Sequence, residues 1–263
     1  MEPVKLGTGW TQILLEAAEN VRSGVRNSIL NRPSMGVQEL KDLLDAEAQQ
    51  AIRKTLKDAG EPVHVISEEG DYSIGEGGPY IVADPIDGTT NLAKGIPLAV
   101  TSLAISETPL LSGVQIGIIL DLYTGEAYRA EIGRGSWRGG QRMAPSGPKL
   151  LKDALVSMDI SKGHPLEPMK PLIQRARYLR QYGCSALSIC HVASGIMDAH
   201  VDLRGGLRIT DAAAALLMLK EAGGVYILNG EMNGDIELSR GSTMTLIAAS
   251  NPGTLEEILN NVS

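Results

Sequence analysis

The first sixty residues carry apolar side chains at helical spacing, in two runs separated by Asn31-Arg32-Pro33-Ser34. Apolar residues that recur every three or four positions place one hydrophobic stripe on a helix. A proline within a polar segment interrupts such a pattern. We therefore predict two amphipathic helices, with Ile13, Leu14, Ala17, Ala18, Val21 and Val25 on the apolar face of the first and Leu40, Leu43, Leu44, Ala48, Ala51, Ile52 and Leu56 on that of the second.

The pattern then changes to short β-branched and apolar runs bounded by turn residues, which is typical of strands. Val63–Ser67 predicts one strand, and residues 70–79, with four glycines, predict a mobile loop. A buried strand begins at Ile81 and runs into a turn, ended by Pro85 and Gly88. An antiparallel meander is expected over residues 98–106, 113–121 and 125–131, ended by a glycine-rich corner at 133–140.

The second half mixes strands and helices without strict alternation. This layout predicts a mixed α/β (α+β) fold and excludes a TIM barrel or a Rossmann fold. Ala144-Pro145-Ser146-Gly147-Pro148 is the best candidate boundary between domains of residues 1–145 and 146–263. Strands are expected at 154–158, 199–203, 225–228 and 245–249, and helices at 165–178, 185–197, 211–222 and after a capping box formed by Thr254 and Glu257.

Composition narrows the class of protein. Of 263 residues, 43% are hydrophobic but only 3% are aromatic and none is Phe, so aliphatic residues must build the core. The net charge of −7 argues against a general affinity for nucleic acid, which needs a basic surface. Cys184 and Cys190 have neither zinc-site nor disulfide spacing and indicate a reducing compartment. With no signal peptide and no apolar run long enough for a membrane span, we expect a cytoplasmic protein.

The candidate chemistry is concentrated at the end of the strand that begins at Ile81. Asp84 and Asp87 lie three residues apart and are followed at once by Gly88-Thr89-Thr90. Carboxylate oxygens are the preferred ligands of Mg²⁺, and a Gly-Thr-Thr turn can open a helix whose N–H groups bind phosphate. The combination favours metal-assisted phosphoryl chemistry. The plainer interpretation is an Asx-turn that leads into a helix.

Further carboxylates could complete a metal site. Glu68-Glu69 closes the strand before this motif, and Asp211 precedes a helix that is apolar on every side. Asp211 could simply cap that helix, but a buried carboxylate needs compensation, which a shared metal would supply. Glu68, Asp84, Asp87 and Asp211 are therefore candidates for one pocket that holds two Mg²⁺ ions. The Asp-x-x-Asp spacing differs from the Asp-x-Asp of haloacid-dehalogenase-like enzymes, which favours attack by a metal-bound water over an aspartyl-phosphate.

These motifs together resemble the inositol monophosphatase family. The resemblance rests on Glu68-Glu69, on the string Asp84-Pro85-Ile86-Asp87-Gly88-Thr89-Thr90-Asn91, and on Asp211-x-x-Ala214 leading to Glu221-Ala222-Gly223-Gly224. It covers nearly the whole chain and is strongest to the archaeal-type members that also hydrolyse fructose 1,6-bisphosphate. It implies a layered α/β/α/β/α sandwich, commonly a homodimer, and a Mg²⁺-dependent phosphomonoesterase that acts on inositol monophosphate, fructose 1,6-bisphosphate or both.

The resemblance also assigns roles to individual residues. Glu68, Asp84 and the Ile86 carbonyl would hold a first Mg²⁺, and Asp84, Asp87 and Asp211 a second, while a third, weaker ion would bind near Glu68. Thr89, assisted by Glu68 and paired with Asp45, would activate the attacking water. The substrate would be held by the N–H groups of Gly88 and Thr89 and by Arg180, Ser185 and Asp202.

The sequence departs from the family pattern at three places. Thr210 stands where many members have Trp before the aspartate. The segment from Glu39 to Asp45 lacks the family's Asp-x-x-Thr-x-x-Asp pattern, which bears on the role of Asp45 and on the third metal. For Asp45, complementing the helix dipole is the default interpretation. Arg204 and Arg208 would suit a second phosphate or would belong to an exposed basic loop.

Two other functions stay open at this stage. One is a phosphatase for 3′(2′),5′-bisphosphate nucleotides or NADP, which would use the same metal ligands. The other is a non-catalytic regulatory protein that kept the fold. The presence of every expected metal ligand argues against this last alternative.

Overall fold

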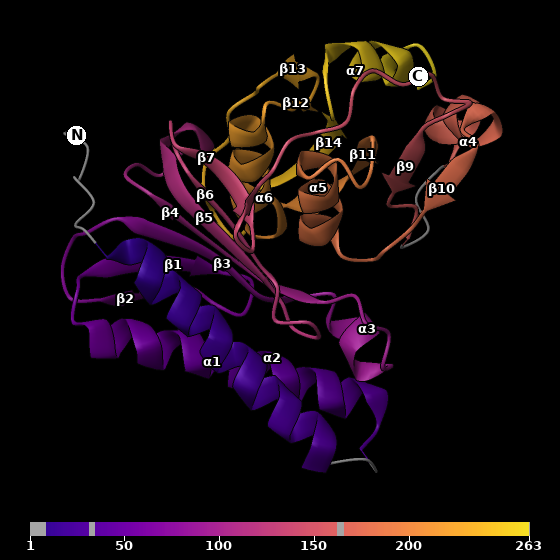
Figure 1. The fold of residues 1–263 in the computed structure, drawn as a ribbon. Helices are drawn as coiled ribbons and strands as arrows, with labels where there is room; N and C mark the ends of the chain where they lie inside the picture. The colour runs from indigo at the N-terminus through magenta and orange to yellow at the C-terminus, as the bar shows by residue number, and fades with distance from the viewer. Residues whose placement is uncertain (1–8, 32–34, 162–165, 263) are drawn as a thin grey trace.

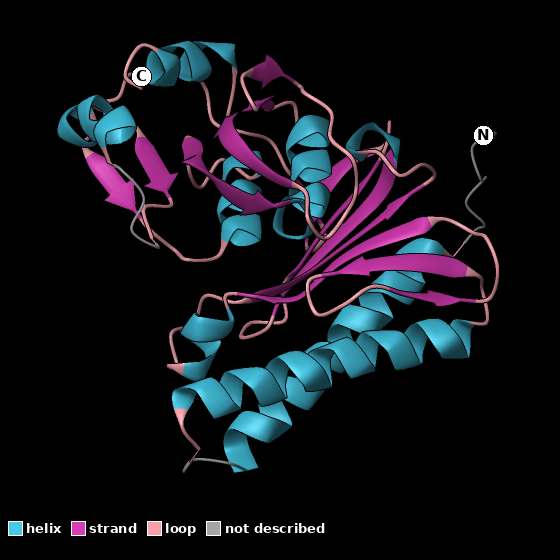
Figure 2. Cartoon of the chain, turned by 180° about the vertical axis from the view of Figure 1, so that it is seen from behind, coloured by secondary structure: helices cyan, strands magenta, loops and turns pink. Residues whose placement is uncertain are grey.

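The chain forms five layers, in which two β-sheets alternate with three layers of helices (Figures 1 and 2). This computed structural model describes residues 9–31, 35–161 and 166–262. The layered sandwich confirms the expected fold class, and no helix among the described residues is long and apolar enough to cross a membrane. The helices are α1 Trp10–Asn31, α2 Val37–Ala59, α3 Thr89–Ala93, α4 Lys170–Arg175, α5 Ser185–Ala193, α6 Ile209–Ala222 and α7 Pro252–Leu259.

Helices α1 and α2 cover the outer face of the first sheet, as Figure 1 shows. Most of each apolar stripe is buried as predicted, with Leu14, Ala17, Leu44 and Ile52 almost fully shielded from solvent. The remaining stripe residues are half-buried, namely Ile13, Leu40, Leu43 and Ala51. Gly60 ends α2 in the left-handed conformation, which glycine adopts without steric cost. The break predicted at Asn31–Ser34 lies largely outside the described residues, since only Asn31 of that segment is placed.

The first sheet has the strand order β2-β1-β3-β4-β5-β6-β7-β8. Strand β1 runs parallel to β3, and the meander from β4 onward is antiparallel as predicted. The glycine-rich corner was wrongly expected to end it, because Gly133 and Gly139 take positive φ in turns that let two more strands pair. The strands are β1 Val63–Ser67, β2 Tyr72–Ile74, β3 Tyr80–Asp87, β4 Val100–Ser106, β5 Val114–Asp121, β6 Ala127–Glu131, β7 Gly135–Arg138 and β8 Gln141–Arg142.

The second sheet has the order β10-β9-β11-β14-β12-β13. Helices α5 and α6 lie between the two sheets, and every residue of α6 from Ile209 to Leu219 is buried. One apolar core thus joins both halves of the chain, and the division at residue 145 remains a proposal. The strands are β9 Leu155–Met158, β10 Tyr178–Arg180, β11 Ala199–Arg208, β12 Val225–Leu228, β13 Glu231–Met232 and β14 Thr243–Ala249.

Three local predictions differ from the structure. The loop expected at 70–79 contains β2, which pairs antiparallel with β1. In place of the long helix expected at 165–178, the chain forms a 3-10 turn, the short helix α4 and then strand β10. Pro168 and Pro171 fit only in the first turn of a helix, so each begins a separate element, and the extended Ala176 ends α4. Position 165 itself lies outside the described residues. The helix expected at 185–197 ends at Ala193, where the chain turns through Ser194 and Gly195.

The capping box at Thr254 and Glu257 is also wrong. Asn251 caps α7 instead, and its side chain accepts a hydrogen bond from the Thr254 N–H at 3.0 Å. Thr254 Oγ1 accepts from the backbone N–H of Lys149 at 3.2 Å, and Glu257 accepts from that of Leu151 at 3.3 Å. These side chains fasten the segment before β9 to α7, a role that spacing along the helix cannot reveal.

Candidate functional site

The central motif lies at the C-terminal end of β3, an inner strand of the first sheet. Its pairing with β4 shifts register between Asp84 and Asp87, where Pro85 has no N–H to donate to the ladder. Thr101 Oγ1 donates to the Pro85 carbonyl at 2.8 Å, and the Ile86 N–H donates to Asp84 Oδ1 at 3.0 Å. The bulge is therefore held by specific hydrogen bonds, which fix both aspartates at the strand end.

Three carboxylates meet at this position. Glu68 follows β1, Asp84 ends the regular part of β3, and Asp211 lies in the first turn of α6. One oxygen from each lies within 4.8 Å of the others. Asp84 is 1% exposed and Asp211 is 8% exposed. Among the described residues, nothing donates a hydrogen bond to Asp84 Oδ2, although this atom is buried. A buried anionic oxygen without a partner is costly, so the cluster is suited to a cation.

The pKa values of these groups indicate the same deficit of positive charge. Burial, reinforced by Asp211 and Glu68, raises the pKa of Asp84 well above its usual value. Burial and the negative charge of Asp211 raise the pKa of Asp87 to about 8. The pKa of Asp211 is raised by burial too, against the opposing effect of Arg208. These carboxylates repel each other unless protons or cations intervene.

Asp87 also connects the motif to α5. Its Oδ2 accepts a hydrogen bond from the Ala186 N–H at 2.7 Å, in the first turn of that helix. An anionic oxygen is favourable there because helix N–H groups point outward at the N-terminus. Contrary to its interpretation as a helix cap, Asp211 does not precede α6. The helix already begins at Ile209, and Asp211 lies with the other carboxylates.

Thr89 and Asp45 form a hydrogen-bonded pair beside the cluster. Thr89 Oγ1 lies 3.0 Å from Asp45 Oδ1 and 2.9 Å from the Ile86 carbonyl oxygen. Burial raises the pKa of Asp45 to about 6, the Thr89 hydrogen bond opposes this, and the charges of Glu69 and Glu68 add to it. Asp45 thus lies at the site and does more than complement the dipole of α2.

Gly88 is required by the turn that joins β3 to α3. Its φ is +96°, and a Cβ at this position would lie 2.6 Å from the Leu98 carbonyl oxygen. Only glycine avoids both the strained backbone and the clash. The turn places the first N–H groups of α3 directly after Asp87.

Asn91, at the end of the motif, has a role that the sequence analysis missed. Its side-chain amide donates to the carbonyl oxygens of Leu98 at 2.9 Å and Tyr182 at 2.7 Å. It thereby fastens α3 to the segment that leads into α5. The residue stood in the recognised string, but its partners are up to 92 residues away and could not be inferred from it.

Arg204 and Arg208 do not form an exposed basic loop, because both lie on β11 and pair with carboxylates. The Arg204 side chain is 7% exposed and lies 2.6 Å from Asp202 Oδ2 and 2.8 Å from Asp159 Oδ2. Arg208 pairs with Glu68 and lies 3.2 Å from Asp211 Oδ1. The sequence singled out both arginines but could not identify these partners.

The predicted substrate contacts lie in different surroundings. Arg180 is exposed on β10 and donates to the Leu179 carbonyl at 2.8 Å. Ser185 is buried as the first residue of α5. Asp202 is fully buried, and its carboxylate accepts hydrogen bonds from Arg204. Their contact with substrate stays a prediction.

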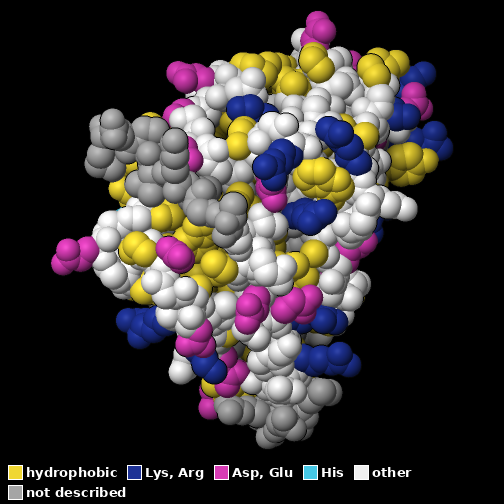
Figure 3. Space-filling view, turned by 60° about the vertical axis from the view of Figure 1, so that its left-hand side comes forward, with side chains coloured by type: hydrophobic (Ala, Val, Ile, Leu, Met, Phe, Trp, Pro, Cys, Tyr) yellow, Lys and Arg dark blue, Asp and Glu magenta, His cyan; other side chains and the backbone are white. Residues whose placement is uncertain are grey.

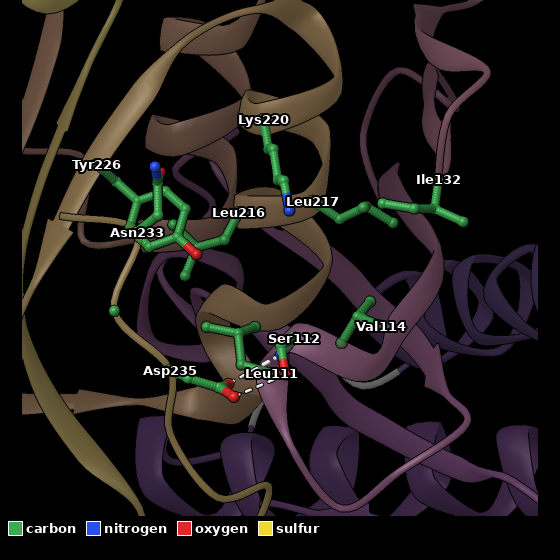
Figure 4. A pocket seen from close by; sticks show the side chains of 11 residues that line it. Leu111, Ser112, Val114, Ile132, Leu216, Leu217, Lys220, Tyr226, Asn233 and Asp235 are labelled. Atoms are coloured by element: carbon green, nitrogen blue, oxygen red, sulfur yellow. Dashed lines mark hydrogen bonds between the residues drawn. The ribbon is translucent and has the colours of Figure 1, made fainter. Parts of the chain in front are cut away.

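The cavity drawn in Figure 4 and the surface charge drawn in Figure 3 do not offer a stronger site. A small cavity of about 70 Å³ lies beside Leu216, Leu217 and Lys220, toward the opposite end of α6 from Asp211 (Figure 4). It is too small for a metabolite, since ligand pockets usually measure about 300 Å³ or more. On the face drawn in Figure 3, Lys and Arg side chains are interspersed with Asp and Glu. That face does not present the continuous basic surface typical of nucleic acid binding.

Comparison with known proteins agrees with the motif and the fold. The model of the inositol monophosphatase family matches residues 4–262. The chain is 33% identical, over 84% of its length and 82% of the relative, to the fructose-1,6-bisphosphatase/inositol-1-monophosphatase of Methanothermobacter thermautotrophicus. It is 27% identical to the bifunctional NADP phosphatase/NAD kinase of Methanococcus maripaludis, over 90% of this chain and 47% of that protein.

A solved structure supports the fold independently. Inositol monophosphatase II from Staphylococcus aureus superposes with a TM-score of 0.82 and covers 97% of this chain and 96% of its own, at 23% identity. This likeness concerns the fold alone. The family match over almost the whole length and the identity to the archaeal relative go further and confirm the resemblance seen in the motifs. The chain belongs to the inositol monophosphatase family.

Proposed function

We propose that this chain is a Mg²⁺-dependent phosphomonoesterase that hydrolyses inositol monophosphate, fructose 1,6-bisphosphate or both. The observation that carries the proposal is the buried carboxylate cluster at the end of β3, beside the turn that opens α3. Membership in the family supports a phosphatase, and the archaeal relative named for both activities supports these substrates.

The residues at the site fit Mg²⁺. Every ligand atom that they offer is an oxygen, which hard cations prefer, and Asp84 Oδ2 is buried with no hydrogen-bond partner among the described residues. Glu68, Asp84 and Asp211 would hold the cation most directly, while Asp87 and the Ile86 carbonyl complete the proposed ligand set. When bound, Mg²⁺ supplies stabilisation of negative charge on the phosphoryl oxygens and a water of lowered pKa.

The Thr89 hydroxyl is placed to take part in proton transfer. It carries a single proton, which it can give to Asp45 or to the Ile86 carbonyl but not to both at once. When the hydroxyl donates to Asp45, its oxygen is left as an acceptor for a proton from the attacking water. Glu68 is the second carboxylate that we propose for this step, since it lies at the cluster and is partly exposed. Thr89 and Asp45 are thus proposed to orient the water and to take up its proton.

The turn at Gly88 serves the phosphate. Gly88 lets the backbone of the turn pass close to the Leu98 carbonyl oxygen. The N–H groups of Gly88 and Thr89 are the proposed donors to the phosphoryl oxygens. The family resemblance proposes Arg180, Ser185 and Asp202 as contacts to the sugar or inositol ring. Asp202 acts there with Arg204, to which it is bound.

A panel of substrates tests the proposal. Phosphate release is measured with Mg²⁺ from inositol 1-phosphate, fructose 1,6-bisphosphate, adenosine 3′,5′-bisphosphate and NADP, each with an EDTA control. We expect metal-dependent release from one or both of the first two. Failure of well-folded protein on both, with Mg²⁺ present, would contradict the proposed substrate class.

A second candidate function is a phosphatase for NADP or bisphosphate nucleotides. The similarity to the bifunctional NADP phosphatase/NAD kinase over 90% of this chain favours it. Release from the nucleotides alone in the same panel would assign this function. Silence on all four substrates would favour a regulatory binding protein. A homodimeric state and a cytoplasmic location remain predictions, and analytical ultracentrifugation tests the first.

A further inference from the structure

The guanidinium of Arg208 contacts two of the three carboxylates of the cluster. One of its terminal nitrogens donates to Glu68 Oε1, and its Nε lies 3.2 Å from Asp211 Oδ1. Glu68 and Asp211 are two of the three residues that could hold a cation together. Within the described parts of the chain, Arg208 is the one basic side chain that forms an ion pair with this cluster.

The position of Arg208 is unfavourable apart from these contacts. It is the N-cap residue of α6, and a positive charge at a helix N-terminus is disfavoured by the helix dipole. Its backbone is fixed because it pairs with Thr243 of β14. The side chain is only 33% exposed, so part of its charge is also removed from water. Attraction to the carboxylates must therefore exceed both costs.

The arginine and a metal ion compete for the same oxygens. A guanidinium donates its N–H groups along the lone pairs of a carboxylate, and a bound cation uses these lone pairs as well. Each N–H bond to Glu68 or Asp211 thus reduces what that carboxylate can offer to Mg²⁺. In return, the guanidinium offsets repulsion between the carboxylates when no cation is bound.

We propose that Arg208 is a built-in counter-cation, which occupies part of the metal site in the metal-free protein and must give up its contacts with Glu68 and Asp211 when a divalent cation binds. Arg208 thereby sets the metal affinity, lowering it while stabilising the metal-free fold. This inference rests on the proposed metal site but not on the identity of the substrate.

The test compares wild type with Arg208→Gln and uses no turnover. EDTA-treated protein is titrated with Mg²⁺ and separately with Mn²⁺ by calorimetry, and its melting temperature is measured without metal. We expect the dissociation constant of Arg208→Gln to be roughly fivefold or more below that of wild type, a coupling of ordinary size. Its metal-free melting temperature should fall. If Arg208 had a merely structural role, its replacement would lower both the stability and the metal affinity.

Control variants separate the possible outcomes. Arg134→Gln removes the same charge from a surface pair with Glu131, where the arginine side chain is 75% exposed, and should leave metal affinity unchanged. Arg208→Lys keeps the charge but loses the forked donor and should bind metal with intermediate affinity, which also covers the case that Arg208→Gln does not fold. Equal or weaker binding by the folded Arg208 variants overturns this inference. Absence of binding in wild type overturns the proposed metal site itself.

Discussion

The carboxylate of Asp84 provides the sharpest test of how the site trades stability for metal binding. Asp84→Asn keeps the shape of the side chain and the acceptor for the Ile86 N–H. It removes the charge from an oxygen that is buried and has no hydrogen-bond partner in the described part of the chain. In the metal-free protein at pH 8, the carboxylate must either stay charged near Asp211 and Glu68 or take up a proton. Both states cost free energy, so we expect the variant to be more stable than wild type without metal.

The size of the gain follows from the burial of this group. Leaving one buried polar group unsatisfied costs about 1–3 kcal/mol. For a chain of this size, each kcal/mol changes the melting temperature by about 2–4 °C, so the EDTA-treated variant should melt several degrees higher. Added Mg²⁺ should stabilise wild type, since a ligand at about a hundred times its dissociation constant contributes about 2.7 kcal/mol. The variant should lose this response together with activity.

Asp198→Asn is the matched control. Asp198 is also buried, but its two oxygens accept hydrogen bonds from Ser146 at 2.5 Å and from the Leu155 N–H at 2.8 Å. This variant should melt lower than wild type both with and without Mg²⁺ and should keep the full metal response. If Asp84→Asn instead destabilises the metal-free protein as much as Asp198→Asn does, the carboxylate is not strained by its surroundings and the reasoning is wrong.

Three further predictions follow from the same site. Thr89→Ala should lower kcat by about 10²–10⁴, the usual effect of a lost acid–base group, and should change KM much less. Thr90→Ala, at an exposed position, is the control, and a rise in KM alone in Thr89→Ala would mean that Thr89 only holds substrate. Gly88→Ala should destabilise the fold by about 1–3 kcal/mol in denaturant melts and impair turnover, whereas Gly139→Ala, with positive φ but open space, should cost less; equal costs would exclude the clash. The folded pKa of Asp87 is about 8 and that of Asp45 about 6, and the ordinary value is 3.8 for both. Between the ordinary pKa and its folded pKa, each group binds more protons in the folded protein than in the unfolded chain. Metal-free stability should therefore decrease from pH 5 to pH 8, and denaturant melts in EDTA that show an increase would contradict the assignment.

Local patterns accounted for much of the fold. The strands at Val63–Ser67 and Val225–Leu228 have the predicted bounds, and α6 is buried on all sides, because each depends on a continuous run of apolar residues. Strand β2 was missed because its three residues lie among glycines and pair only through the tertiary fold. The capping role of Thr254 was misassigned because its partner, Lys149, lies far away in the chain.

The site shows the same limit. Asp84, Asp87 and Gly88 could be recognised together because one turn contains all of them. The pairing of Asp45 with Thr89 came from the family resemblance alone, since 44 residues separate them. No pattern indicated that Arg208 would reach Glu68 across 140 residues, because that contact depends on how the second sheet packs against the first.

The most direct test of the proposed metal site is to locate divalent cations in the protein. Crystals grown with Mn²⁺ in place of Mg²⁺ would reveal the ion by its anomalous scattering. We expect a peak coordinated by oxygens of Glu68, Asp84 and Asp211, and its loss in Asp84→Asn. An active protein with Mn²⁺ bound only elsewhere, or with the same peak in the variant, would show that this cluster is not the metal centre.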